Sequence, residues 1–208
     1  LFRSIPMGSG LIDLTPTPIT LPDGTPIPDN SYVLCVGTIT IRKNHQLLLD
    51  VWEHFAATHP HDQIPHLIVA GTKGWLSDET MSRLHRTPQL RGIVHHLQHA
   101  TDEQIAWLYQ HCAFTVYPSL YEGWGLPVTE SHDFCKLCLT TTTSSLPEAA
   151  NGLAPLLDPH DRTLWANQIW HYWTNPTARQ QHEHTIHTNH HHTTTHDTTT
   201  TILNLAPR

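Results

Sequence analysis

Short apolar runs alternate along the chain with longer segments in which apolar positions recur every three or four residues. The short runs are typical of buried strands, and the longer segments are typical of amphipathic helices. The expected strands span 32–36, 66–70, 92–95, 113–117, 137–140 and 154–157. The expected helices span 44–58, 77–86, 102–112, 127–134 and 161–173, with a short one after Ser145.

Polar residues at three helix starts support these boundaries. Asn44 is a candidate N-cap for the first helix. Thr101 with Gln104, and Ser145 with Glu148, have the spacing of a capping box, in which two side chains satisfy backbone N–H groups reciprocally.

The order of the elements predicts the fold class. Apolar strands that alternate with helices indicate a parallel sheet covered on both faces. Because crossovers between parallel strands are nearly always right-handed, we expect an α/β fold with a Rossmann-like, doubly wound sheet. Ligands of such sheets bind beyond the carboxyl ends of the strands.

The segments before and after the alternating strands and helices differ from them in composition. Residues 1–30 hold six prolines and three glycines, which predicts an irregular arm or linker. Residues 182–201 are rich in histidine and threonine, which leaves open degenerate terminal helices, disorder or a metal site. We therefore divide the chain into a linker (1–30), a Rossmann-like domain (31–176) and a helical, His- and Thr-rich tail (177–208).

Composition narrows the functional classes. The 208 residues carry 11 basic and 18 acidic side chains, for a net charge of −7, so the basic surface of a nucleic-acid-binding protein is absent. No apolar run approaches the ~20 residues of a membrane span. Four scattered cysteines indicate reduced thiols rather than a disulfide framework. We therefore expect a cytoplasmic protein, and the initial Leu1 suggests a piece of a longer chain.

The strongest candidate for chemistry is the segment 117–130, which follows a strand and begins a helix. Gly123 and Gly125 allow the backbone to approach a ligand closely. The helix N-terminus offers free N–H groups that favour a phosphate. Glu122 and Glu130 flank this turn and are suited to accept hydrogen bonds from sugar hydroxyls; the alternative is a solvated loop.

A second candidate lies after the first strand, where Gly37 and Thr38 lead to Arg42 and Lys43. A basic pair is most often a solvated surface feature. Next to the loop that carries Glu122, however, it predicts a diphosphate site, with Arg as a bidentate donor and Lys as a point charge.

Together these motifs resemble glycosyltransferase family 4 of the GT-B fold. The resemblance covers about residues 32–176, and it rests on the pair Glu122 and Glu130 and on several further segments. These segments are Gly37 with 42–44, 69–75, 101–109, 144–148 and 158–159. The resemblance implies that the chain is the C-terminal, donor-binding half of a retaining enzyme that needs no metal or other cofactor.

The resemblance also implies roles for individual residues. Glu130 would bind the ribose of the nucleotide-sugar donor, and Glu122 the transferred sugar. Arg42 and Lys43 would neutralise the diphosphate, so that these two and Glu122 are the expected catalytic residues. The remaining donor-binding residues would be Gly37, Thr38, Gly123, Trp124, Gly125 and Leu126.

The same resemblance sets expectations for partners. The acceptor would be a glycan or a lipid-linked glycan, and the full enzyme would associate peripherally with the inner face of a membrane. The N-terminal acceptor domain would lie outside this chain, which alone would lack transfer activity. Two other functions are alternatives to a glycosyltransferase half: a non-catalytic module that binds sugar nucleotides, and a His-rich metal-handling protein.

Some positions depart from the family pattern. Cys135 stands where the family usually has glycine, Leu137 where it often has proline, and Asp133 where a small apolar residue is common. We expect strain in the turn between this helix and the next strand.

Overall fold

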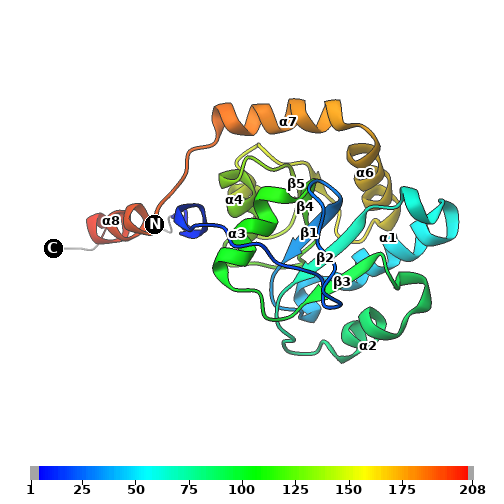
Figure 1. Cartoon of the computed structure of the whole chain (residues 1–208). Helices are drawn as coiled ribbons and strands as arrows, with labels where there is room; N and C mark the ends of the chain where they lie inside the picture. Colours follow the sequence, from blue (N-terminus) through cyan, green and yellow to red (C-terminus); the bar gives the residue numbers. More distant parts are fainter. Residues whose placement is uncertain (1–4, 206–208) are drawn as a thin grey trace.

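The core of the molecule is one six-stranded parallel sheet with the order β3-β2-β1-β4-β5-β6 (Figure 1). The computed structural model describes residues 5–205, so the extreme ends of the predicted linker and tail lie outside the described residues. The strands are β1 (Tyr32–Val36), β2 (His66–Ala70), β3 (Val94–Leu97), β4 (Phe114–Tyr117), β5 (Cys138–Thr141) and β6 (Leu156–Leu157). This is the doubly wound α/β sheet that the alternating pattern predicts, and that prediction is confirmed.

Helices cover both faces of the sheet. The helices of the described chain are α1 (His45–Thr58), α2 (Asp78–Arg86), α3 (Asp102–His111), α4 (Leu126–Asp133), α5 (Leu146–Ala150), α6 (Arg162–Thr174), α7 (Pro176–Asn189) and α8 (Thr195–Leu205), of which α8 does not cover the sheet (Figure 1). Because side chains alternate along a strand, β1 contributes Val33 and Cys35 to one core with α1 and α6. It contributes Tyr32 and Leu34 to a second core with α3 and the N-terminal segment.

The third and sixth strands differ from their predicted bounds. β3 begins at Val94 rather than at 92, because Gly92 has a φ of +82° and belongs to the turn that precedes the strand. β6 has only two residues, and its pairing with β5 is limited to Leu156 and Leu157.

Of the predicted caps, only the box at α3 forms as expected. The Thr101 hydroxyl accepts from the Gln104 N–H, while the Gln104 side chain accepts from the Thr101 N–H. Asn44 precedes α1 with a φ of +55°, and its side chain donates to the Pro159 carbonyl instead of capping. The box at Ser145 is wrong, because that hydroxyl donates to carbonyls of a neighbouring loop.

The His- and Thr-rich segment forms α7 and α8, and Ile186 of α7 is fully buried. Figure 1 shows α8 beside the N-terminal segment, away from the sheet. Among residues 5–205, no three His, Cys, Asp or Glu side chains are grouped so as to hold a metal ion. Nor is any helix in this part of the chain long and apolar enough to cross a membrane.

Candidate functional site

The candidate site lies beyond the carboxyl ends of β1 and β4, which are neighbours in the sheet. After β1 the chain makes a short 3₁₀ helix, Ile41–Lys43, and after β4 it forms the loop that carries Glu122. The two loops are tied together, because the Arg42 carbonyl accepts from the Leu120 N–H at 2.9 Å and from the Ser119 hydroxyl at 3.1 Å. The parallel topology therefore joins the two motifs that the sequence singles out.

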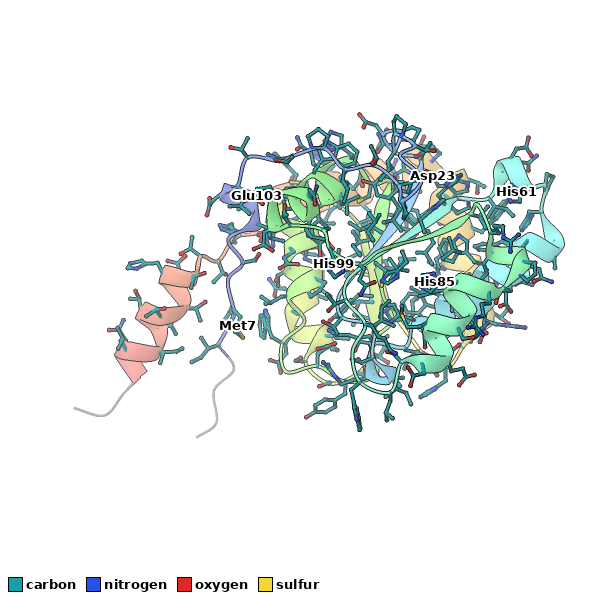
Figure 2. All side chains as sticks on the ribbon, turned by 60° about the horizontal axis from the view of Figure 1, so that its bottom comes forward. Met7, Asp23, His61, His85, His99 and Glu103 are labelled. Atoms are coloured by element: carbon teal, nitrogen blue, oxygen red, sulfur yellow. The ribbon has the colours of Figure 1, made fainter. Side chains whose placement is uncertain are left out.

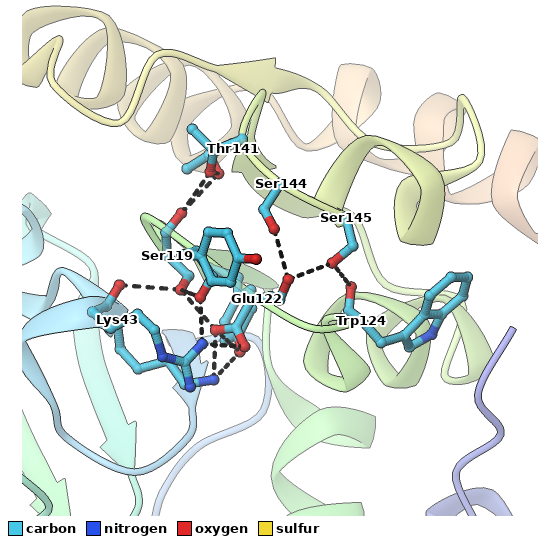
Figure 3. Close-up of polar contacts among 11 residues, drawn as sticks. Lys43, Ser119, Glu122, Trp124, Thr141, Ser144 and Ser145 are labelled. Carbon is cyan, nitrogen blue, oxygen red and sulfur yellow. Dashed lines mark hydrogen bonds and ion pairs between the residues drawn. The ribbon is translucent and has the colours of Figure 1, made fainter. Parts of the chain in front are cut away.

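Glu122 is the centre of a charge cluster with the two basic residues. Its Oε2 lies 2.5 Å from Nη1 of Arg42, and its Oε1 lies 2.7 Å from Nζ of Lys43 (Figure 3). The side chains of Glu122 and Lys43 are 7% and 13% exposed, whereas that of Arg42 is 43% exposed. The cluster therefore presents Arg42 to solvent and holds Lys43 and Glu122 beneath it.

Two hydroxyl groups complete the cluster. Ser119 donates to Glu122 Oε1 at 2.7 Å, and Tyr117 donates to the same oxygen at 2.8 Å. Lys43 Nζ in turn donates to the Tyr117 hydroxyl. Burial by itself would raise the pKa of Glu122, but hydrogen bonds from Lys43, Ser119 and Arg42 outweigh it and lower the pKa from its ordinary 4.5. Burial next to Glu122 raises the pKa of Tyr117, which stays a protonated donor.

The loop that carries Glu122 is fixed by the turn after β5. Ser144 donates to the Glu122 carbonyl at 2.6 Å, and Ser145 donates to the carbonyls of Glu122 and Trp124 at 3.0 and 2.9 Å (Figure 3). Side chains that satisfy loop carbonyls replace the hydrogen bonds that regular structure would supply. The backbone near Glu122 is therefore fixed by the side chains of Ser144 and Ser145.

Glycine is required where the two loops approach other segments. Gly125 has a φ of +107°, and a Cβ there would overlap the side chain of Leu146. Gly37 has a φ of +143°, and a Cβ on its neighbour Gly71 would overlap the backbone of Gly37. In contrast, a Cβ on Gly123 would meet open space.

Glu130 lies apart from the charge cluster, on α4. Its Oε2 accepts from Tyr109 at 2.9 Å and its Oε1 accepts from Ser9 at 3.1 Å. Burial raises the pKa of Glu130 above its ordinary 4.5, although the hydrogen bonds from Tyr109 and Ser9 act in the opposite direction. Glu130 lines a cavity of about 510 Å³ together with Leu126.

The remaining predicted residues lie around these two groups. Trp124 packs against the small core of α4 and α5, and its Nε1–H has no partner among the described residues. Thr38 is exposed in the loop after β1. A larger cavity of about 780 Å³ follows the edge strand β3, but none of the predicted site residues lines it.

The hydroxyl groups that donate to the two carboxylates were not predicted from the sequence. Tyr117 and Ser119 lie within the motif itself, and they could have been found as the polar residues nearest to Glu122. Tyr109 belongs to the apolar face of α3 and gives no such signal. Ser9 lies in the arm, far from Glu130 in the sequence.

The turn after α4 has the backbone that the family pattern predicts for glycine. Cys135 adopts a φ of +53°, a left-handed conformation that is costly for a residue with a Cβ. The backbone of the turn is nevertheless paired, since the Cys135 N–H donates to the His132 carbonyl and the Lys136 N–H to the Ser131 carbonyl. Asp133, the other unusual residue, accepts from His190 and His192 at 2.7 Å each.

Comparison with known proteins places the chain among glycosyltransferases. The family described as "Glycosyl transferases group 1" matches residues 21–186. Over 130 residues, 62% of the chain, the sequence is 32% identical to the O-antigen chain mannosyltransferase B of Escherichia coli. The aligned part spans only 33% of that relative, so the chain corresponds to about one third of its length.

Solved glycosyltransferases share the fold. TarM superposes with a TM-score of 0.65 and 18% identity, over 91% of this chain and 37% of TarM. WaaG, a glycosyltransferase involved in lipopolysaccharide biosynthesis, superposes with a TM-score of 0.60 and 15% identity, over 75% of this chain and 42% of WaaG. The match to the family extends over most of the chain, from residue 21, which precedes β1, to α7, and includes both loops of the site. The chain therefore belongs to the group 1 glycosyl transferases.

Proposed function

We propose that the chain is the donor-binding part of a retaining glycosyltransferase, which transfers a sugar from a nucleotide-sugar to a glycan or lipid-linked acceptor. The observation that carries the proposal is the contact of Arg42 and Lys43 with Glu122 beyond the carboxyl ends of β1 and β4. Glu130, on the helix that follows the same loop, lines a cavity with room for part of a nucleotide.

Arg42 and Lys43 are suited to bind the diphosphate of the donor. Each carries a positive charge, and charge-assisted hydrogen bonds to phosphate are about twice as strong as neutral ones. As the bond from sugar to diphosphate breaks, negative charge grows on the leaving group. Positive groups fixed before the reaction stabilise that charge without reorganisation. Since these side chains supply the positive charge, the proposal requires no metal ion or other cofactor.

The two carboxylates are suited to hold hydroxyl groups. In the proposed complex Glu130 accepts from the ribose and Glu122 accepts from the transferred sugar. Glu122 already accepts from four side chains, so a bound diphosphate would compete with it for Arg42 and Lys43. The reacting sugar becomes oxocarbenium-like, and the departing phosphate can take the proton of the acceptor, so no base is required from this part of the protein.

A second domain supplies the acceptor site in this proposal. The chain covers a third of its mannosyltransferase relative, and transfer requires both substrates to be held in one orientation. We therefore expect the 208-residue chain to bind a donor and to lack transfer activity by itself. We further propose that the full enzyme acts in the cytoplasm, peripherally at the inner face of a membrane, and that the relative's name favours a mannosyl donor.

A binding panel tests the proposal. The chain is titrated with UDP, GDP and ADP and with their sugar conjugates, GDP-mannose included. Glu130→Ala should weaken binding of the nucleoside diphosphate, whereas Glu122→Ala should chiefly weaken binding of the intact sugar nucleotide. Equal losses for both ligands in both variants would contradict the assigned roles.

A further inference from the structure

The hydroxyl of Ser9 occupies one oxygen of the carboxylate that we propose binds ribose. Ser9 Oγ donates to Glu130 Oε1 at 3.1 Å, and the two side chains are 8% and 9% exposed. Ser9 belongs to the N-terminal arm, by which we mean residues 5–14. A ribose offers hydroxyl groups, so the arm presents to Glu130 the same chemical group that a nucleotide would present.

The two donors to Glu130 differ in how they are held. Tyr109 lies on α3 in the second core and is 1% exposed, so its hydroxyl is fixed by packing against the sheet. Ser9 lies on irregular chain between two glycines, and Met7, two residues before it, is 47% exposed. Of the two, therefore, Ser9 is the donor that can leave with less disturbance, because Leu11 of the arm packs only at the margin of the second core, whereas Tyr109 lies within it.

The arm is attached to the C-terminal segment by a few polar contacts. The Gly8 N–H donates to the Thr198 hydroxyl at 3.0 Å, and that hydroxyl donates to the Pro6 carbonyl at 3.0 Å. A Cβ on Gly8 would overlap the backbone of Thr193 and Thr194. Figures 1 and 2 both show the start of the arm next to α8, whereas its short 3₁₀ helix, Leu11–Asp13, packs against α3 and α4.

The arm also forms one wall of the cavity at Glu130. Ser9 and Leu11 line it from the arm. On the other side, Val36 lines it from the carboxyl end of β1, and Leu126 lines it from α4. Val36 ends β1 and Leu126 begins α4, so the cavity opens on the two loops that hold the charge cluster. A ligand that reached from the cluster to Glu130 would therefore meet the arm.

We propose that Ser9 stands in for a ribose hydroxyl in the free protein, and that a nucleotide displaces the arm from Glu130 when it binds. This inference rests on the proposed function, because it assumes that Glu130 binds the ribose. While the arm occupies Glu130, a nucleotide cannot bind there. The observed affinity is therefore the intrinsic affinity multiplied by the fraction of molecules in which the site is free. Removal of the Ser9 hydroxyl should therefore tighten nucleotide binding, which is the opposite of what loss of a ligand-binding residue would do.

The test uses calorimetry to compare the affinity of the full chain for two kinds of ligand, nucleoside diphosphates and inorganic pyrophosphate. UDP, GDP and ADP carry ribose, whereas inorganic pyrophosphate carries only the phosphates. The binding of pyrophosphate should therefore not depend on Glu130. Ser9→Ala should bind the nucleoside diphosphates about threefold to tenfold more tightly, as expected for the loss of one competing hydrogen bond to a carboxylate. Its affinity for pyrophosphate should stay unchanged.

Three further variants serve as controls. Ser9→Thr keeps the hydroxyl and should bind like the original chain. Thr17→Ala removes an exposed hydroxyl from the segment after the arm and should have no effect. Gly8→Ala leaves Glu130 and Ser9 intact but separates the arm from Thr193, so it should tighten binding in the same direction as Ser9→Ala.

Hydrogen exchange provides a readout that does not depend on affinity. The N–H groups of Gly8 and Leu11, which donate to Thr198 and to Ser9, should exchange faster when the nucleotide is bound. Weaker nucleotide binding by Ser9→Ala, equal tightening for pyrophosphate, or unchanged exchange in the arm would overturn the inference and leave the proposed function standing. Failure of every nucleotide to bind any variant would overturn both.

Discussion

Lys43 Nζ and Glu122 Oε1 lie 2.7 Å apart, although the two residues follow different strands. They meet because β1 and β4 are parallel neighbours whose carboxyl ends share one edge of the sheet. The Tyr117 hydroxyl lies between them, since it donates to Glu122 and accepts from Lys43. This buried arrangement of charge and hydroxyl groups is the structural basis of the proposed diphosphate site.

Tyr117→Phe should destabilise the protein by about 1–2 kcal/mol, because it removes a buried hydrogen bond to a charged group while it keeps the ring. The free energy of unfolding, measured by urea denaturation, checks this value. Tyr121→Phe is the matched control, since the Tyr121 side chain is 66% exposed and should change the stability by less than about 0.5 kcal/mol. Equal stability of the Tyr117→Phe variant and the original chain would show that the hydroxyl contributes nothing.

Lys43→Gln should weaken binding of pyrophosphate about tenfold or more, because a buried charge opposite phosphate is lost. Isothermal titration calorimetry at constant ionic strength measures the effect. Lys73→Gln removes a cation that is 48% exposed and pairs with Asp78, so it controls for the overall change in charge. Similar losses for the two variants would indicate general electrostatic attraction instead of a site at Lys43.

Nucleoside diphosphate binding should weaken as the pH falls through the raised pKa of Glu130, because a protonated carboxyl accepts hydrogen bonds less well. The contribution of Glu130 to folding stability depends on pH in the opposite direction. A raised pKa in the fold stabilises the protein below the ordinary value of 4.5, and this stabilisation is lost as the pH rises through the pKa of the folded state.

Tyr109→Phe provides the control for this pH dependence. The Tyr109 hydroxyl favours the ionised form of Glu130, so its loss should raise the pKa of Glu130 further. The midpoint of the binding curve against pH should therefore move to higher pH in this variant. An unchanged midpoint would mean that Glu130 does not control the titration.

Gly71→Ala should destabilise the chain by about 1–3 kcal/mol, because its Cβ would overlap the backbone of Gly37 in a packed region. It should also weaken pyrophosphate binding, since the loop after β1 would have to shift. Thermal unfolding and calorimetry measure the two effects. Gly10→Ala, whose Cβ would meet open space, should leave the stability nearly unchanged; the same loss at both positions would show that the close approach at Gly71 is unimportant.

Most of the fold could be predicted from the sequence because parallel strands are apolar throughout and contrast with their flanking loops. The predicted element boundaries and caps were wrong where the backbone conformation of one residue, or a hydrogen-bond partner far along the chain, determines the local structure. Gly92 ends a turn rather than starting a strand, and Ser145 donates to the Glu122 loop rather than capping α5. Neither alternative can be recognised from local spacing.

The site could be predicted only in part for the same reason. Arg42, Lys43 and Glu122 lie in recognisable loops, and the order of elements brings those loops together. The residues that hold Glu130 lie on α3 and in the arm, where Tyr109 looks like an ordinary core residue and Ser9 like part of a linker. Only the three-dimensional packing connects them to the carboxylate.

Calorimetric titration of the chain with nucleoside diphosphates, before and after Lys43→Gln and Glu130→Ala, tests the central claim most directly. We predict that at least one of UDP, GDP and ADP binds with a Kd well below about 1 mM, or about −4 kcal/mol. We further predict that both substitutions weaken this binding, whereas only Lys43→Gln weakens the binding of pyrophosphate. The absence of binding below about 1 mM for all three nucleotides, or affinities that neither substitution changes, would contradict the account.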